Sequence, residues 1–244
     1  MTSYQKRLRR SVLAFVIFMS VLSCGLGITA ASAYIKYQQT MRIDTPSANQ
    51  LKAVTIVDEW YLILVNKWNP IPDGYKVTLT NLRNGQAVDE RCYPDLQKMM
   101  DDCRAAGLSP LICSSYRSQA KQEKLYANRV KDFLAQGYPE EEAKKEAGKY
   151  LAIPGTSEHQ LGLAVDIVDI NKQALNSAQE KTEVQQWLMK NSWKYGFILR
   201  YPANKSDITG ISYEPWHYRY VGREAAARIY EENICFEEYL QSMS

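Results

Sequence analysis

The apolar residues of the chain recur at two spacings, and these predict its secondary structure from about residue 56 onwards. Leu96, Met99, Cys103 and Ala106 lie at helical intervals and are followed by Gly107, the pattern of an amphipathic helix that ends at a glycine. Other helices are predicted to start at Ser118 and Thr182, to cover residues 139–149 and to start near Arg223. Strands are predicted over residues 61–65, 111–114, 164–170, 197–201 and 216–221. Helices and strands mix without a regular β-α-β alternation, so the pattern predicts an α+β fold.

Two of the predicted helices begin at residues that commonly cap helices. Ser118 precedes a segment with apolar residues at helical spacing, and a serine hydroxyl can accept a hydrogen bond from a free backbone N–H of the first turn. Thr182 is followed three residues later by Gln185, which is the spacing of a capping box. We therefore expect helices to begin directly after Ser118 and Thr182.

The first 33 residues are predicted to form a basic tip and a membrane anchor or signal segment. Residues 12–28 are almost wholly apolar and uncharged, and four Lys or Arg residues lie between positions 6 and 10. An apolar run of about 17–20 residues can span a membrane and is long for a signal peptide, which favours an anchor. Ala31-Ser32-Ala33 resembles a signal-peptidase site, so a cleaved, secreted protein is the alternative. Both readings export the body of the chain and leave the basic cluster in the cytoplasm.

The remainder divides into a stalk and a domain, and its charge excludes one class of partner. Residues 34–55 are polar without sustained periodicity and are predicted to be a stalk, and residues 56–244 are predicted to form the domain. The 244 residues carry a formal net charge of +3, but without the four basic residues of the tip, 26 basic groups face 27 acidic ones. A nearly neutral body has no electrostatic means of holding a phosphate backbone, so nucleic-acid binding is not expected.

Four cysteines lie beyond the amino-terminal segment: Cys92, Cys103, Cys113 and Cys235. No pair has the C-x-x-C spacing of a zinc ribbon or a thioredoxin-type site. Export would permit disulfides. Because Cys103 and Cys113 fall at apolar positions of a predicted helix and strand, buried free thiols are the favoured reading.

The chain contains two histidines, and each lies beside carboxylates in a segment marked by glycine or proline. His159 belongs to a segment that runs from Ser157 to Asp166, and His217 follows Glu214, Pro215 and Trp216. Two imidazoles and one carboxylate can hold Zn²⁺ and leave a fourth position for water. A carboxylate near that water can take its proton. The spacing alone does not show that two segments some 50 residues apart meet, and ordinary buried or exposed histidines remain the alternative.

Three motifs in a fixed order identify a resemblance to a known family. They are S-x-H-x-x-G-x-A-x-D over residues 157–166, E-x-W-H over residues 214–217, and an upstream S-Y-R-S-x-x-x-Q over residues 115–122. This set resembles the VanY-type zinc D-alanyl-D-alanine carboxypeptidases, which are related to VanX-type dipeptidases and share the metal-site architecture of the hedgehog signalling domain. The resemblance covers about two-thirds of the chain, from about Leu62 to the helix after Gly222. It implies a small, mostly antiparallel sheet with flanking helices.

The resemblance also implies a role for each residue of the motifs. His159, Asp166 and His217 would be the zinc ligands, with Asp169 as a nearby carboxylate that the motif spacing does not select. Glu214 would be the general base and Arg117 would stabilise the developing oxyanion, while Ser157 and Gln122 would hydrogen-bond the substrate. The implied substrate is the D-Ala-D-Ala end of the peptidoglycan stem pentapeptide, outside a bacterial membrane. Loss of the terminal D-Ala would remove the group that vancomycin-type antibiotics bind, so a resistance role and simple trimming of the wall are both open.

The spacing of the motifs constrains the local backbone. His159 and Asp166 are seven residues apart, which would place them on opposite faces of a regular strand. We therefore expect the strand to be broken around Gly162. Glu214 and His217 raise the same difficulty, and because Pro215 restricts the residue before it, a bend is expected there.

Three other functions can be weighed against this one. An LD-carboxypeptidase acting on the stem tetrapeptide shares these motifs, and the pocket walls that select chirality are not evident from the sequence. A wall-binding module with a non-catalytic zinc would not need Glu214 or Arg117. A serine acyl-transfer enzyme is not expected, because the chain has no G-x-S-x-G nucleophile motif.

Overall fold

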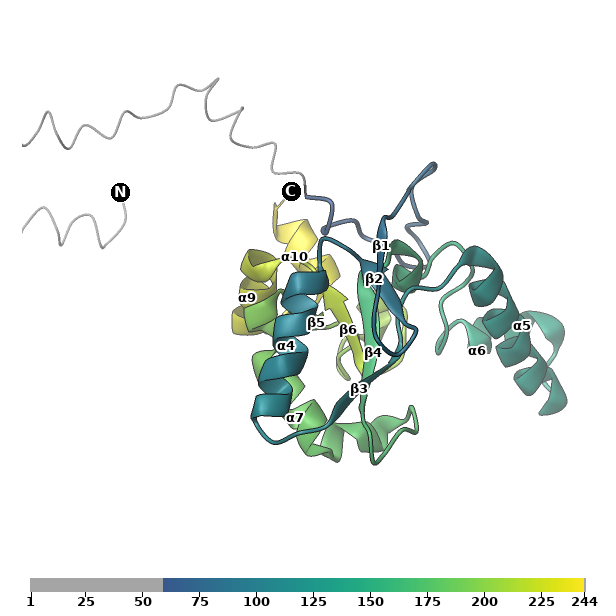
Figure 1. The fold of residues 1–244 in the computed structure, drawn as a ribbon. Helices are drawn as coiled ribbons and strands as arrows, with labels where there is room; N and C mark the ends of the chain where they lie inside the picture. Colours follow the sequence, from purple (N-terminus) through teal and green to yellow (C-terminus); the bar gives the residue numbers. More distant parts are fainter. Residues whose placement is uncertain (1–58, 244) are drawn as a thin grey trace, which may run out of the picture. The chain divides into compact units, whose positions relative to one another are not determined.

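The computed structural model of the protein describes residues 59–243 (Figure 1). The predicted tip and anchor over residues 1–33 and the predicted stalk over residues 34–55 lie outside the described residues. Within residues 59–243, no helix is both long and apolar enough to cross a membrane.

The domain is built on a four-stranded antiparallel sheet. Its strand order is β3 (Pro110–Ser114), β4 (Ala164–Asp169), β6 (His217–Tyr220) and β5 (Phe197–Leu199). A separate hairpin pairs β1 (Leu79–Asn81) with β2 (Ala87–Asp89). Helices flank the sheet without a β-α-β repeat, so the predicted α+β class with a small antiparallel sheet is confirmed.

The helices lie on both sides of the sheet (Figure 1). They are α4 (Tyr93–Ala105), α5 (Gln119–Ala135), α6 (Glu140–Ala147), α7 (Glu183–Asn191), α8 (Ser206–Thr209), α9 (Arg223–Glu232) and α10 (Phe236–Met243), with short 3-10 turns η1 (Glu158–Leu161), η2 (Ser177–Lys181) and η3 (Ser192–Tyr195). Helices α5 and α6 pack on each other and stand to one side, whereas α4 and α7 contact each other and the strands.

Strand β4 separates the core from the site because its two faces carry different residues. Val165 and Ile167 are buried in the main apolar cluster together with Leu96 of α4 and Leu188 of α7. Asp166 lies between them in sequence and therefore points to the opposite face of the sheet. This alternation leaves one buried carboxylate on the face away from the core helices.

Two predicted helix starts agree with the structure, with one difference in detail. The Ser118 hydroxyl accepts from the Lys121 backbone N–H (3.3 Å), and the Thr182 hydroxyl accepts from the Gln185 N–H (3.2 Å). The Gln185 side chain does not return to Thr182, however. It donates to the carbonyl of Ile167 and accepts from the Tyr218 hydroxyl (2.9 Å). Half of the predicted capping box therefore forms, and its other half ties α7 to the sheet.

The predicted strand over residues 61–65 is wrong. Tyr61 lies in a turn, and the residues after it form no strand. The backbone carbonyls of Tyr61 and Ile63 accept instead from the guanidinium of Arg219 (3.0 and 2.9 Å). The apolar side chains of this segment pack against the two core clusters. The apolar run therefore predicted correctly that these side chains are buried or partly buried. The backbone carbonyls, however, are hydrogen-bonded by an arginine side chain and not by a neighbouring strand.

The four cysteines of the domain are all unpaired. Cys92, Cys103 and Cys235 are buried and Cys113 is partly buried. Burial raises the pKa of the Cys103, Cys113 and Cys235 thiols to about 11. The structure therefore agrees with the favoured reading of free, buried thiols.

Candidate active site

Strand register brings the predicted metal-ligating residues together. Asp166 in β4 lies directly opposite His217 at the start of β6, and residues opposite each other in an antiparallel pair share one face of the sheet. His159 in η1 approaches from the side, with its Nε2 3.4 Å from Asp166 Oδ2. His217 Nδ1 is 3.1 Å from Asp166 Oδ1. All three side chains are buried, and one ligand atom from each lies within 4.8 Å of the others.

A glycine turn supplies the expected break between His159 and Asp166. Turn η1 ends at Gly162, which has a φ of +75°, a region that residues with a β-carbon rarely adopt. The Gly162 N–H bonds back to the His159 carbonyl (3.2 Å), and the Gly162 carbonyl accepts from Asp89 N–H in β2 (2.9 Å). The chain therefore reverses between His159 and β4, so that both side chains reach one point.

The second expected bend lies between Glu214 and His217. The His217 N–H donates to the Glu214 carbonyl (3.2 Å), which closes a turn through Pro215. This turn places Glu214 Oε2 3.7 Å from His217 Nδ1. Glu214 therefore faces the same nitrogen as Asp166 does, from the side of the pocket.

The protonation of the two histidines differs because their partners differ. His159 Nδ1 lies 2.8 Å from the Ser115 carbonyl, which can only accept, so its Nε2 lone pair faces Asp166. Burial and the guanidinium of Arg117 lower the pKa of His159 to about 4, and the ring is neutral at pH 7. For His217, burial opposes the charged form, but hydrogen bonds to Asp166 and Glu158 raise its pKa to about 9 in the metal-free protein.

The two carboxylates of the site also titrate differently. Burial opposes ionisation of Asp166, yet His159 and His217 hold its pKa well below the usual value. Burial raises the pKa of Glu214 to about 8, and the neighbouring Asp166 carboxylate adds to this shift while His217 reduces it. Two acids with opposite shifts in one pocket are the pattern of a permanently ionised group beside a proton carrier.

Arg117 lies against Asp166 and not on the surface. The residue is 8% exposed, its Nη2 donates to Asp166 Oδ2 (2.9 Å), and its Nη1 donates to Gln122 Oε1 (3.4 Å). Arg117 also lines the pocket. One guanidinium thus holds the central carboxylate and presents positive charge to the cavity.

Ser157 and Gln122 occupy different places. Ser157 is buried and lines the pocket. Gln122 is 0% exposed and is absent from the pocket lining; its amide donates to the Ala152 carbonyl (2.7 Å) as well as accepting from Arg117. In the structure Gln122 therefore hydrogen-bonds Arg117. The predicted contact between Gln122 and the substrate stays a prediction. Asp169 lies at the far end of β4, where its carboxylate accepts from the Asn171 N–H (2.8 Å).

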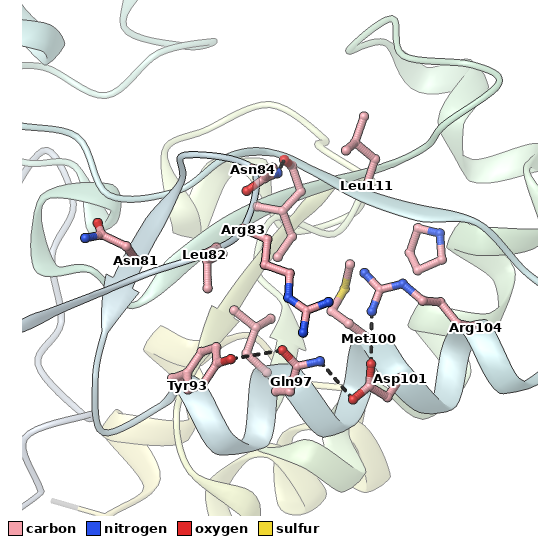
Figure 2. Close-up of a pocket in the computed structure, with 13 residues that line it drawn as sticks. Asn81, Leu82, Arg83, Asn84, Tyr93, Gln97, Met100, Asp101, Arg104 and Leu111 are labelled. Atoms are coloured by element: carbon pink, nitrogen blue, oxygen red, sulfur yellow. Dashed lines mark hydrogen bonds and ion pairs between the residues drawn. The ribbon is translucent and has the colours of Figure 1, made fainter.

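The pocket that contains these groups has a volume of about 390 Å³. Its wall includes Tyr201, Tyr213 and Trp216 beside the polar residues, so aromatic and charged side chains line the same pocket. A larger hollow of about 830 Å³ lies between the β1–β2 hairpin, α4 and β3 (Figure 2). Neither histidine nor cysteine lines it, and its carboxylate Asp101 is bonded to Gln97 and Arg104. The chemistry-bearing groups are therefore in the smaller pocket.

The donor set of the smaller pocket fits zinc. Two imidazole nitrogens and one carboxylate are the protein ligands of many catalytic zinc sites, which keep a further coordination position open. In this chain the His159 ring is oriented by a carbonyl and the Asp166 carboxylate by a guanidinium. Outer partners of this kind are usual for metal ligands.

Sequence reasoning missed one residue of this site, Glu158. It is fully buried, and its Oε2 is 3.4 Å from His217 Nε2. Burial opposes its ionisation, but Arg200 and Arg219 hold its pKa below the usual range. The position of Glu158 in the sequence, between Ser157 and His159 and shortly before a buried strand, was a signal that its side chain is buried.

The comparisons with known proteins agree with this geometry. Residues 85–223 match the family model described as VanY, D-alanyl-D-alanine carboxypeptidase. A D-alanyl-D-alanine carboxypeptidase of Enterococcus faecalis is 50% identical over 184 residues, which are 75% of this chain and 67% of the relative. A putative carboxypeptidase of Bacillus subtilis, YodJ, is 40% identical over 193 residues, again 75% of this chain and 67% of the relative.

Solved structures show the same relationship. VanYB in complex with D-alanine-D-alanine has a TM-score of 0.71 at 49% identity, over 76% of this chain and 100% of that one. A vancomycin resistance D,D-pentapeptidase VanY in complex with Zn(II) has a TM-score of 0.69 at 49% identity, over 75% and 99%. The LdcB LD-carboxypeptidase has a TM-score of 0.63 at 35% identity, over 73% and 84%. The chain belongs to the VanY D-alanyl-D-alanine carboxypeptidase family.

Proposed function

We propose that this protein is a zinc-dependent D-alanyl-D-alanine carboxypeptidase that removes the terminal D-Ala of peptidoglycan stem pentapeptides. The observation that carries the proposal is the single pocket in which His159, Asp166 and His217 meet, with Glu214 and Arg117 on its wall. A base and a fixed cation beside a zinc-type donor set are the parts that amide hydrolysis needs, and a binding module would need neither.

His159, Asp166 and His217 would hold the zinc ion. Zinc in such a site lowers the pKa of water toward about 7 and polarises a carbonyl. The similarity to the Zn(II) complex of a VanY enzyme supports the choice of this metal.

Glu214 is the proton carrier of the proposed mechanism. Its Oε2 lies at the pocket side of His217, within reach of a water that attacks the scissile carbonyl. The carboxylate takes a proton from that water and returns it to the leaving amine, which is the role of a base that then acts as an acid. The buried position that raises its pKa also makes the protonated form a competent donor.

Arg117 and Ser157 supply the remaining polar groups. The guanidinium of Arg117 is fixed by Asp166 and Gln122, so it is preorganised toward negative charge that develops on the carbonyl oxygen. Removing one such donor typically costs about 10²–10³ in rate. The Ser157 hydroxyl lines the pocket and would hydrogen-bond the substrate.

The choice of the pentapeptide over the tetrapeptide is supported by similarity. The VanY enzymes are 49–50% identical to this chain, and the LD-carboxypeptidase LdcB is 35% identical. The test measures D-Ala release by the full-length protein from pentapeptide and tetrapeptide stems, with and without a chelator. Chelator-sensitive release from the pentapeptide is expected. Release from the tetrapeptide alone would overturn the proposed substrate. Zinc binding without turnover of either stem peptide would favour a binding module.

We further propose that the domain works outside a bacterial membrane, held by the segment over residues 12–28 or secreted after its cleavage. The apolar, uncharged character of that segment and a wall substrate support this placement. Fractionation of cells with protease protection of the domain tests it. A raised tolerance to vancomycin on expression would support a resistance role, and unchanged tolerance would favour wall trimming.

A further inference from the structure

Glu158 is a buried carboxylate to which the mechanism above gives no part. It is 1% exposed and lies immediately before His159, at the start of η1. Its two oxygens have different partners. Oε1 accepts from Arg200 Nε (2.7 Å) and is paired with Arg219 Nη1 (3.0 Å), whereas Oε2 is 3.4 Å from His217 Nε2.

The other nitrogen of the same imidazole faces the pocket. His217 Nδ1 is 3.1 Å from Asp166 Oδ1 and 3.7 Å from Glu214 Oε2. Both nitrogens face carboxylates, so the ring can carry a proton on each of them when no metal is bound. A metal held together with Asp166 and His159 would take Nδ1, because that nitrogen lies on their side. A neutral imidazole then keeps its one proton on Nε2, where an ionised Glu158 can only accept it.

Glu158 is itself held from behind by a buried network of four charged groups, which we call the ion network: Glu158, Arg200, Arg219 and Glu237. Arg200 donates two hydrogen bonds to Glu237 of α10 (2.9 and 2.6 Å). Two carboxylates face two guanidinium groups, so the network is electrically balanced. The position of Glu158 is therefore fixed by Arg200, directly after β5, and by Arg219 of β6, with Glu237 of α10 holding Arg200 in turn.

We propose that Glu158 is a positioning residue of the metal site, which accepts the Nε2–H of His217 and so aims Nδ1 at the metal. The inference rests on the proposed zinc site. A carboxylate on the outer nitrogen of a metal-binding imidazole fixes the tautomer and the ring orientation and raises the basicity of the ligand. In His159 a backbone carbonyl, that of Ser115, does the same with less charge.

The first experiment measures zinc affinity in Glu158→Gln by competition with a chromophoric chelator, using full-length protein. The amide keeps the shape of the side chain but removes the charge, and its NH2 group can turn toward the ring. Zinc affinity is expected to fall by about 10- to 100-fold, the usual cost of losing such a partner. Activity at limiting zinc should fall with it and recover as zinc is raised. Wild-type zinc affinity in this variant would overturn the proposal.

Glu237→Gln is the matched control. It removes the same charge from the other side of Arg200 and leaves the contact between Glu158 and His217 in place. Both variants should lose stability, but zinc affinity should change only in Glu158→Gln. An equal loss of zinc affinity in both variants would show that the balance of the ion network matters and not the bond to His217, and would overturn the proposal.

A second measurement needs no variant and applies even where Glu158→Gln does not fold. The chain contains two histidines, so ¹⁵N spectra of the zinc-loaded wild type report two rings. His159 is expected with its proton on Nδ1, and His217 with its proton on Nε2. Two rings with the proton on Nδ1 would overturn the proposal.

The zinc titrations and the ¹⁵N spectra use no substrate, which separates this inference from the proposed function. A protein that shows the affinity loss and both tautomers, but releases no D-Ala, would contradict the function and leave Glu158 as proposed. A protein that releases D-Ala normally, with Glu158→Gln binding zinc as wild type does, would contradict this inference alone.

Discussion

Asp166 is the residue on which the site depends, because its carboxylate is shared. Arg117 donates to one oxygen and His217 lies beside the other. The buried charge is thus compensated from both sides before any metal binds. A carboxylate fixed in this way cannot rotate freely, so its geometry is set by the protein fold.

Glu214→Ala tests the proton carrier. The variant should keep zinc, because Glu214 is outside the predicted ligand set, and should lose about 10²–10⁴ in kcat, the usual contribution of a general base. His217→Ala should lose both zinc and turnover. Zinc content by elemental analysis and D-Ala release check the pair, and near-wild-type turnover in Glu214→Ala would show that another group is the base.

Gln122→Ala separates a positioning role from contact with substrate. The structure places its amide between Arg117 and the Ala152 carbonyl. Losing a buried hydrogen bond of this kind costs about 1–3 kcal/mol, so we expect kcat to fall by about tenfold or more with little change in KM. Ser157→Ala, in the pocket wall, should raise KM instead. A raised KM with unchanged kcat in Gln122→Ala would restore the substrate contact expected from the sequence.

At the scale of elements, the turn at Gly162 determines whether η1 and β4 can present their side chains together. A β-carbon at Gly162 would lie 2.9 Å from the Asp89 backbone nitrogen, and the residue has a φ of +75°. Neither the backbone of β2 nor the turn can move without shifting His159. Glycine is therefore required at this position for two reasons: its positive φ, and the lack of space for a β-carbon beside Asp89.

Gly162→Ala should destabilise the domain by more than the strain of its backbone angle, which is about 1–3 kcal/mol. Gly155→Ala is the control, because Gly155 has a φ of +84° but nothing within 4 Å of an added β-carbon. Urea unfolding of both variants gives the difference. Equal losses of stability would show that the contact with Asp89 is relieved at no cost.

Sequence patterns predicted the elements whose ends are marked locally. Ser118 and Thr182 start helices through their own side chains, and such signals are visible without the fold. Several elements were not anticipated: the β1–β2 hairpin, the short helix α8, the 3-10 turns and α10. Helix α10 turns an acid, Glu237, inward to Arg200, which conceals its buried face from a pattern that counts apolar residues only.

The sequence predicted the candidate site only in part, because contacts between distant segments leave no local signal. The motifs identified the residues that meet in the pocket, because zinc binding and proton transfer allow only a few residue types. Gln122 and Glu158 bond to groups far away in the chain, Ala152 and His217. The partner of Glu158 depends on where β6 lies, and the partner of Gln122 depends on the path of the loop after α6. No spacing within a single segment reports either of these.

Considered as a whole, the molecule should gain stability when zinc binds. The proposed ligands come from η1, β4 and β6, which meet only in the native state, so zinc binds the folded form and stabilises it by about 1.4 kcal/mol for each tenfold excess over Kd. The melting temperature should therefore rise with zinc concentration and fall on chelation. A melting temperature independent of zinc, in protein shown to bind it, would mean that the unfolded chain binds zinc equally well.

The domain should also lose stability at high pH through its tyrosines. Burial, with Asp102 beside Tyr195 and Glu180 beside Tyr213, raises the pKa of both phenols to about 12, against about 10 in an unfolded chain. The native state thus holds protons that the unfolded state releases, so stability is full below pH 10 and declines as pH rises toward 12. Phenolate absorbance and circular dichroism followed together check this. Complete ionisation near pH 10 with native dichroism would contradict it.

The four unpaired cysteines have a consequence for how the protein matures. Because residues 59–243 contain no disulfide, this domain can reach its native state in a reducing or an oxidising compartment, without a thiol oxidase or isomerase. Thiols whose pKa is raised by burial carry almost no thiolate at neutral pH, and the thiolate is the form that reacts. The thiols of the folded domain should therefore resist alkylation and oxidation by peroxide. The rate of sulfhydryl labelling then reports how often the core opens or unfolds.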